Sequence, residues 1–518
     1  MENRLSKRIR PKHKSARVRG CTFVYLNSKL NIMRALVLIF ILISVTSFGQ
    51  TTADQPRDFL SKEFHLDRRN KLRESMPPNS VAVFFANPER NRSNDVDYPY
   101  HQDPDFYYLT GYKEANAVLL IFKDKQTAAN GTRYDEIIFV QPRNIAMEMW
   151  SGRRLGELKT KESLGLQQAF NNTEFKKYNV DFSKFDEILF YKFHNDVRNK
   201  TYDSADLYDL IVEFKRKVNY PSGEAISLRP EAAKNNLNVT RLNTLMTNLR
   251  GIKTPDELEL LRKAVTISCV GQNEVMKAMK PGLSEREIQG IHEFVFKKYQ
   301  AEEVGYPSIV GGGHNGCILH YMENYKPAID SKELVLMDLG AEYHGYTADI
   351  TRTIPASGKF SPEQRQIYEI VLGAQEEAMK ICKPGTTFEA LTRATKDAVN
   401  RGLKELGIIP TEDTPHMYYP HGCCHHIGLD VHDKGAYDVL RENMVITIEP
   451  GIYIPENANC DKKWWGIAVR IEDDFLITAD GHEHLSKISP RHPDEVEAMM
   501  KQKSILDDFV LPALEVSR

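Results

Sequence analysis

The sequence predicts two folded regions of different class, an α/β region at residues 51–250 followed by an α+β region at residues 251–518. Three observations predict them. In the first region, short apolar runs alternate with helical patterns, which is typical of a buried sheet covered by helices. In the second region, capping boxes mark the starts of long helices. Strand-like segments that carry acidic residues lie between and after those helices.

Length and composition are those of a globular protein. The chain has 518 residues, of which 41% are hydrophobic and 27% are charged, close to the average for folded domains. These values exclude a disordered or collagen-like chain. The formal net charge of −2 gives no overall field that would attract nucleic acid, so we expect no nucleic-acid partner.

The first 50 residues have the pattern of a leader with a signal peptide. The basic residues within positions 1–20 are also compatible with a solvated tail or a nucleic-acid arm. Met33 and Arg34 then precede an uncharged apolar stretch at 35–46, as in a secretory signal peptide. That stretch is shorter than the roughly 20 residues that span a bilayer, and a signal anchor is the alternative. We expect removal of residues 1–50, a periplasmic or secreted protein, and no membrane span in the mature chain.

The elements of the first region follow from apolar runs and one amphipathic pattern. The runs are rich in β-branched and aromatic residues, as buried strands are. Strands are expected at 80–85, 117–122, 136–140 and 187–191, and a helix is expected at 206–218.

The elements of the second region begin at three capping boxes. Thr254, Ser284 and Ser361 each precede a Glu or Gln three positions later, which predicts a helix start. Helices are therefore expected from residue 255, at about 285–299 and at 362–381. Strands in antiparallel pairs are expected at 334–337, 346–353, 445–448 and 467–477.

Four acids occupy positions of these strands where the pattern is otherwise apolar. Asp338 ends one strand and Asp349 lies in the strand that returns, so a hairpin would bring them side by side. Glu449 and Glu472 follow two further apolar strands. Neighbouring buried carboxylates repel one another, and a proton or a metal must compensate. A single acid of this kind is usually a strand-end surface residue, but four of them predict a site of hard oxygen ligands.

Histidines are concentrated in one segment, residues 420–433. It holds His421, His425, His426 and His432, which indicates a metal-binding loop or a polar loop with hydrogen-bonded imidazoles. The adjacent pair at 423–424 is compatible with a thiolate zinc site, but no second Cys pair lies at zinc-finger spacing. The seven cysteines of the chain match no disulfide framework.

At this point the sequence resembles a known family. Residues 254–490 resemble the metallopeptidase domain of the pita-bread fold, and specifically aminopeptidase P (Xaa-Pro aminopeptidase), in a family that includes prolidase, creatinase and methionine aminopeptidase. Residues 58–250 resemble the N-terminal domain of that family less sharply, through segments 101–111 and 150–156. The five matching stretches of the catalytic domain are 309–321, 337–353, 421–433, 448–453 and 470–474.

The resemblance implies a site with two divalent metal ions. It implies that Asp349 and Glu472 bridge the ions, that His320 and His432 hold the substrate carbonyl, and that Tyr453 lines the same wall as His421 and Arg470, beside the ligands or in the proline pocket. The implied metal ligands are Asp338, Asp349, His425, Glu449 and Glu472. Four carboxylates and one imidazole suit Mn²⁺ better than a zinc-selective site.

The histidine segment departs from the family pattern. His426 stands where the family usually has a large apolar or aromatic residue, and Cys423 and Cys424 stand where it has small ones. His426 leaves open which imidazole coordinates the metal. The register of Gly422 and Gly428 favours His425.

The expected activity is that of an Xaa-Pro aminopeptidase, which releases the N-terminal residue of peptides with proline at the second position. Metal ions lower the pKa of a bound water, and Glu449 is the expected general base. No Gly-x-Ser-x-Gly motif or cysteine-protease signature is present, so covalent catalysis is the weaker mechanism. Prolidase is the closest alternative, and a non-catalytic pita-bread protein is a further one. The resemblance also implies a homo-oligomer, either a dimer or a tetramer.

Overall fold

The computed structural model describes residues 58–128, 130–201, 203–221, 235–509 and 511. The predicted leader at 1–50 lies outside these residues, so its removal stays a prediction. Contacts group the chain from Leu60 onward into one compact unit, and the boundary expected at residue 250 also stays a prediction. Within the described residues, we find no helix with the length and apolar character needed to cross a membrane.

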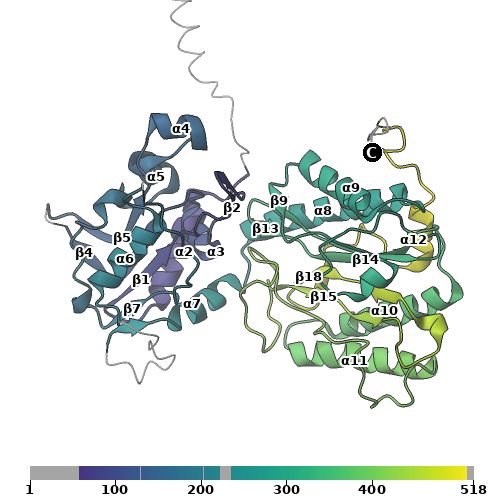
Figure 1. Ribbon diagram of the computed structural model, residues 1–518. Helices are drawn as coiled ribbons and strands as arrows, with labels where there is room; N and C mark the ends of the chain where they lie inside the picture. Colours follow the sequence, from purple (N-terminus) through teal and green to yellow (C-terminus); the bar gives the residue numbers. More distant parts are fainter. Residues whose placement is uncertain (1–57, 129, 202, 222–234, 510, 512–518) are drawn as a thin grey trace, which may run out of the picture. The chain divides into compact units, whose positions relative to one another are not determined.

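The first region is built on a six-stranded sheet in the order β6-β5-β4-β1-β7-β8 (Figure 1). All four predicted strands are present in it. The sheet is mixed, because β1 pairs antiparallel with β4 and parallel with β7. Its strands are β1 (Ser80–Phe85), β4 (Val118–Thr127), β5 (Arg133–Val140), β6 (Ala169–Asn171), β7 (Glu187–Leu189) and β8 (Leu237–Asn238).

Both faces of this sheet are buried, which explains why its strands are continuous apolar runs. Val81 and Val83 of β1 point into one core, and Ala82 and Phe84 point into another, as the two-residue period of a strand requires. The predicted helix at 206–218 is α6, and it packs on the first of these cores. The other strands and α-helices that the structure describes in this region are α2 (Lys62–Ser75), β2 (Asn91–Ser93), β3 (Val96–Asp97), α3 (Pro104–Thr110), α4 (Ile145–Ser151), α5 (Gly156–Leu164), α6 (Leu207–Lys217) and α7 (Arg241–Arg250).

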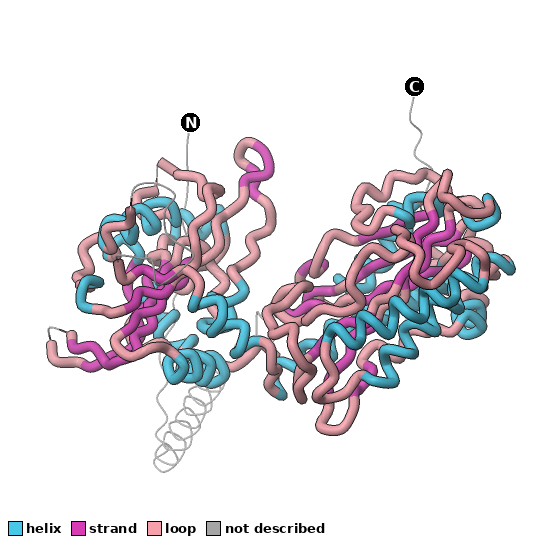
Figure 2. The backbone as a smooth tube through the Cα atoms, turned by 90° about the horizontal axis from the view of Figure 1, so that it is seen from below, coloured by secondary structure: helices cyan, strands magenta, loops and turns pink. Residues whose placement is uncertain are grey.

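The second region contains the predicted long helices, each beginning at its capping box. Thr254 shows the reciprocal bonding of the box, since its N–H donates to Glu257 Oε2 at 2.9 Å and its Oγ1 accepts the Glu257 N–H. α8 packs with α9 and α10 packs with α11, and the helices lie alongside the strands (Figure 2). The helices are α8 (Pro255–Ala278), α9 (Glu285–Lys298), α10 (Pro362–Ile381), α11 (Phe388–Glu405) and α12 (Pro493–Met499).

The strands of the second region form several small sheets, in the orders β10-β11-β14, β13-β12-β9, β15-β18-β19 and β16-β17. The antiparallel pairing expected from the sequence is present throughout. The strands are β9 (Glu303–Val304), β10 (Ile309–Gly312), β11 (Leu334–Leu339), β12 (Ala341–Tyr343), β13 (Tyr346–Thr347), β14 (Ile350–Pro355), β15 (Val445–Ile448), β16 (Gly451–Ile454), β17 (Ile467–Arg470), β18 (Asp473–Ile477) and β19 (His482–His484).

Two of the predicted strands are each divided in two, and an acid lies at each break. The segment 346–353 divides into β13 and β14 around Asp349, and 467–477 divides into β17 and β18 around Glu472. The Asp349 N–H donates to the side chain of Asp474 at 3.1 Å instead of to a strand partner. A single continuous strand would hold each acid in one pleat, whereas these breaks turn both acids toward one site.

A close backbone approach completes this arrangement. At Gly340, an added Cβ would lie 1.9 Å from the carbonyl oxygen of Ala348, so only glycine fits there. The approach brings the end of β11, which carries Asp338, next to the residue before Asp349.

Arg250, at the end of α7, holds the histidine segment against the first region. Its guanidinium is buried and donates to Asp105 at 2.7 Å, to Asp430 at 2.8 Å and to Asp433. Lys253 also donates to Asp433 at 2.7 Å. A buried ionic cluster of this kind is sensitive to the loss of one member, because the remaining charges are left without a partner.

Replacing Arg250 with methionine is expected to lower the free energy of unfolding by about 3–5 kcal/mol. Arg241→Met is the matched control on the same helix, since the half-exposed guanidinium of Arg241 pairs with Glu187 and such surface pairs contribute about 0–1 kcal/mol. Urea unfolding followed by circular dichroism measures both. Equal losses in the two variants would contradict the role of Arg250.

Candidate metal centre

Nine of the ten residues singled out from the sequence line one cavity of about 330 Å³. They come from separate parts of the second region and meet where strands end or break. The nine are His320, Asp338, Asp349, His421, His425, His432, Glu449, Arg470 and Glu472. Tyr453 is not among the lining residues, but its hydroxyl contacts two of them, His421 at 2.8 Å and Arg470 at 3.0 Å.

The centre of the site is the imidazole of His425. Its Nε2 lies 3.4 Å from Asp349 Oδ2, 3.5 Å from Glu449 Oε1 and 4.0 Å from Glu472 Oε1. Asp349, His425 and Glu472 each offer one ligand atom within 4.8 Å of the others, and all three side chains are buried. Atoms bound to one cation at about 2.0–2.3 Å lie roughly 3–4.5 Å apart, so these separations fit a shared cation.

Four neighbouring carboxyl groups are buried in this site, which disfavours their ionised forms unless a proton or a cation compensates. Burial, followed by the charges of neighbouring acids, raises the pKa of Asp349 and of Glu472 well above the usual range. Burial raises the pKa of Glu449 to about 7. Burial opposes ionisation of Asp338 as well, but Arg470, which donates to its Oδ2 at 2.6 Å, lowers its pKa. The donor set of acids and one imidazole therefore fits hard divalent cations.

The contacts of Tyr306 also indicate that the charges of the acids are compensated. Its hydroxyl oxygen lies 2.6 Å from Oδ1 of Asp338 and 2.6 Å from Oδ1 of Asp349. One hydroxyl hydrogen can make a full hydrogen bond to only one of two carboxylates at a time. Either one acid carries a proton or a cation lies between them. This is the compensation for the repulsion between Asp338 and Asp349 that the sequence predicted.

The structure distinguishes His425 from His426. His425 Nδ1 lies 3.0 Å from the His426 carbonyl oxygen, and a bond of this kind orients the other ring nitrogen of a metal-binding histidine. His426 points away from the acids. Its ring packs against Phe388 and Tyr437, with centroids 5.1 Å apart in each case, and burial lowers its pKa to about 4. His426 thus packs as a large apolar or aromatic residue at this position would.

Arg470 contacts two of the acids, with Nη2 lying 2.6 Å from Asp338 Oδ2 and Nε lying 3.9 Å from Glu472 Oε2. Besides Asp338, it contacts the Oγ1 of Thr351 at 3.0 Å, and that hydroxyl lies 2.6 Å from Glu472 Oε2. Burial, with Arg470 as the next cause, lowers the pKa of His421 to about 4. His320 and His432 are exposed, so their imidazoles are open to a ligand in the cavity.

Three residues of this site were not expected from the sequence. Tyr306 lies between β9 and β10, where no periodicity or motif marks it. Thr351 lies in β14 and within the matching stretch 337–353, but the sequence assigned it no role. Asp474 did have a signal in the sequence, since it is an acid in β18, the largely apolar strand that begins at the residue after Glu472. The Asp474 side chain is buried, its Oδ1 has no hydrogen-bond partner among the residues that the structure describes, and burial raises its pKa to about 8.

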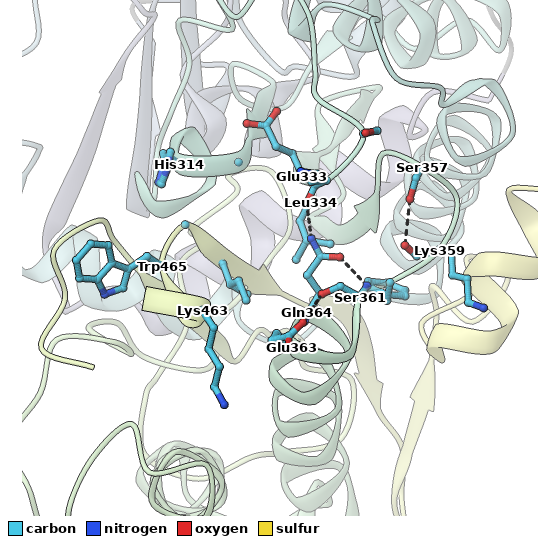
Figure 3. Close-up of a pocket in the computed structure, with 16 residues that line it drawn as sticks. His314, Glu333, Leu334, Ser357, Lys359, Ser361, Glu363, Gln364, Lys463 and Trp465 are labelled. Carbon is cyan, nitrogen blue, oxygen red and sulfur yellow. Dashed lines mark hydrogen bonds between the residues drawn. The ribbon is translucent and has the colours of Figure 1, made fainter. Parts of the chain in front are cut away.

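A larger hollow of about 540 Å³ lies elsewhere, at the start of α10 (Figure 3). None of the residues predicted from the sequence lines it. Its buried Gln364 is satisfied by the backbone, because Nε2 donates to the Lys332 carbonyl at 2.7 Å and Oε1 accepts from Ser361 N at 2.9 Å. The smaller cavity is the candidate site because acids and histidines that can bind a metal line it.

Comparison with known proteins agrees with this geometry. The family model described as metallopeptidase family M24 matches residues 259–479. The model described as the aminopeptidase P N-terminal domain matches residues 65–188. The second match lies in the region that carries the six-stranded sheet, and the first spans all the strands whose ends or breaks carry the four acids.

Relatives match nearly their whole length. The Xaa-Pro aminopeptidase of Escherichia coli is 34% identical over 458 residues, which are 85% of this chain and 98% of the relative. That of Haemophilus influenzae is 36% identical with the same coverage. The structure of aminopeptidase P from E. coli with the inhibitor Pro-Leu superposes with a TM-score of 0.73 at 33% identity, covering 85% of this chain and 98% of that one. The predicted α/β N-terminal domain and α+β pita-bread domain are thus confirmed, and the chain belongs to metallopeptidase family M24, among the proteins of the aminopeptidase P type.

Proposed function

We propose that this protein is a metal-dependent Xaa-Pro aminopeptidase that holds two divalent cations, with Mn²⁺ as the metal. The single observation that carries the proposal is the convergence of four carboxylates and one imidazole on a cavity that exposed histidines border. The relatives named above are Xaa-Pro aminopeptidases, and the E. coli structure holds a proline-containing inhibitor. The proposed ligands are Asp338, Asp349, His425, Glu449 and Glu472.

When bound, the cations supply Lewis-acid chemistry that polarises a carbonyl and makes a water nucleophilic at neutral pH. The chain's own residues do the rest. We assign Glu449 as the base that accepts the proton of the attacking water at a carboxylate oxygen. His320 and His432 are placed to donate hydrogen bonds to the carbonyl oxygen of the first residue and to the negative charge that develops on it.

A substrate with proline at the second position requires a binding surface that accommodates the proline ring. The proline nitrogen carries no hydrogen and the ring fixes φ. A peptidase that binds an extended backbone through hydrogen bonds therefore loses one hydrogen bond to proline and cannot bind it in the extended conformation. His421, Tyr453 and Arg470 form a connected row through the Tyr453 hydroxyl. We assign this row to the side of the cavity that receives the proline ring.

We further propose that the protein is exported, to the periplasm or the medium, and that it forms a homo-oligomer. The basic segment followed by an apolar stretch at 35–46 supports export. The N-terminal sequence of the mature protein tests export, because it is expected to begin near residue 51. Sedimentation of the purified protein tests assembly.

The activity is tested by comparing three peptides with the purified protein, namely Xaa-Pro-Xaa, Xaa-Pro and Xaa-Ala-Xaa. We expect release of the first residue from the proline tripeptide, loss of this activity on chelation, and recovery on adding Mn²⁺. Faster cleavage of the dipeptide would assign the protein to prolidases. Absence of any metal-dependent release from the tripeptide would overturn the proposal.

A further inference from the structure

Two adjacent cysteines border the candidate metal centre, and neither the family assignment nor the proposed reaction uses them. Cys423 and Cys424 directly precede His425, and their Sγ atoms lie 3.5 Å apart. Cys423 is fully buried, whereas Cys424 is partly exposed and lines the cavity. All the cysteines that the structure describes have free thiols.

The spacing of the two sulfurs suits a shared partner atom better than a disulfide. A disulfide needs sulfurs about 2.05 Å apart and Cα atoms usually about 4.4–6.8 Å apart, whereas neighbouring Cα atoms across a trans peptide lie about 3.8 Å apart. A thiolate binds a soft cation such as zinc at about 2.3 Å. Two sulfurs 3.5 Å apart would then subtend roughly 100° at that cation, close to a tetrahedral angle.

We propose that Cys423 and Cys424 form a dithiol site that binds one soft, thiophilic ion or metalloid through both sulfurs. Thiolates select soft ions, and carboxylates select hard ones, so this site is chemically distinct from the cluster of acids beside it. The partly exposed Cys424 is reached first from the cavity. The Cys423 sulfur, 3.5 Å away, then closes the chelate.

Binding at this dithiol is coupled to the metal centre through the backbone. The Cys423 carbonyl accepts a hydrogen bond from the Glu449 N–H at 2.8 Å, and the His425 carbonyl accepts one from the Thr447 N–H at 2.9 Å. An atom held by both sulfurs restrains the peptide between them, which carries the carbonyl that holds Glu449. Occupancy is therefore expected to inhibit the peptidase.

The probe for this site is phenylarsine oxide, a trivalent arsenical. In the reaction, two S–H bonds break and two As–S bonds form, and the oxygen of the reagent leaves as water with the two thiol protons. Arsenic stays trivalent, so no oxidant is needed. Mass spectrometry of the intact full-length chain is expected to show one phenylarsenic adduct. An excess of a dithiol should remove the adduct, whereas a monothiol wash should leave it in place.

Variants identify the two sulfurs. Cys424→Ser and Cys423→Ala are each expected to lose the adduct, and Cys317→Ser and Cys460→Ser, which remove other partly exposed thiols, are expected to keep it. Cys382→Ser is included because it removes another buried thiol, and it too should keep the adduct. Circular dichroism verifies that each variant is folded.

Several results would overturn the proposal. These are an adduct that survives in Cys424→Ser or Cys423→Ala, removal of the adduct by a monothiol, or absence of an adduct at saturating reagent. The mass measurement needs no peptidase activity. Its failure is thus distinguishable from failure of the proposed function, which the peptide assay tests alone.

Discussion

Replacing Asp349 with asparagine is expected to remove both metal ions and to abolish peptide hydrolysis. Asp349 lies 3.4 Å from His425 Nε2, shares the Tyr306 hydroxyl with Asp338, and its charge also acts on Glu472. A carboxylate in this central position is the proposed bridge between the ions. Asparagine keeps its shape but has one ligand oxygen and no charge, so neither ion keeps its full set of anionic ligands.

Metal analysis of the dialysed protein measures this effect directly, alongside the peptide assay. His426→Phe is the matched control, because His426 packs against Phe388 and Tyr437 and not against the acids. It should retain the metal content of the parent protein. Two ions per chain in the Asp349→Asn variant would refute the bridging role. Loss of metal in the His426→Phe variant alone would refute the choice of His425.

The metal-free proteins provide a check on folding. Removing one of four neighbouring buried carboxylates relieves repulsion, so metal-free Asp349→Asn should melt no lower than the metal-free parent. A lower melting temperature would mean that Asp349 serves the fold and not a cation.

The sequence predicted most of the residues that line the candidate cavity, because the acids among them depart from the pattern of their strands. Acids such as Asp338 and Glu472 stand where burial favours apolar residues, and that conflict is visible without a structure. Helix starts were equally visible, since a capping box is a local device that involves residues three positions apart. Thr254 and Glu257 bond as the sequence implied.

What could not be predicted depends on contacts between distant segments. Tyr306 is joined to Asp338 and Asp349 only through the fold, and nothing in its neighbouring residues marks it. The breaks at Asp349 and Glu472 were also missed, because the apolar pattern continues across them while the backbone changes sheet. His426 illustrates a third case, in which a polar residue stands where the resemblance implies a large apolar or aromatic one and packs against neighbouring rings.

Replacing Glu449 with glutamine distinguishes its proposed role as a metal ligand from its proposed role as the general base. The side chain lies 3.5 Å from His425 Nε2, at the end of β15, where its N–H is held by the Cys423 carbonyl. It is proposed both as a ligand and as the base. Glu449→Gln retains an oxygen of the same reach, but the amide cannot accept a proton from water. At saturating Mn²⁺ we expect kcat to fall by about 10²–10⁴-fold, with a smaller change in KM.

The metal dependence of that variant decides between the two roles. If Glu449 acts only as a ligand, excess Mn²⁺ will restore kcat to near the value of the parent protein, and the assignment of a base will be wrong. If it acts as the base, kcat stays low at every metal concentration while metal analysis shows bound ions. Asp474→Asn is the matched control, because it replaces a buried carboxylate that does not line the cavity and keeps an acceptor for the Asp349 N–H. A loss of kcat in Asp474→Asn as large as that in Glu449→Gln would show that the site responds to its total charge, with no special part for Glu449.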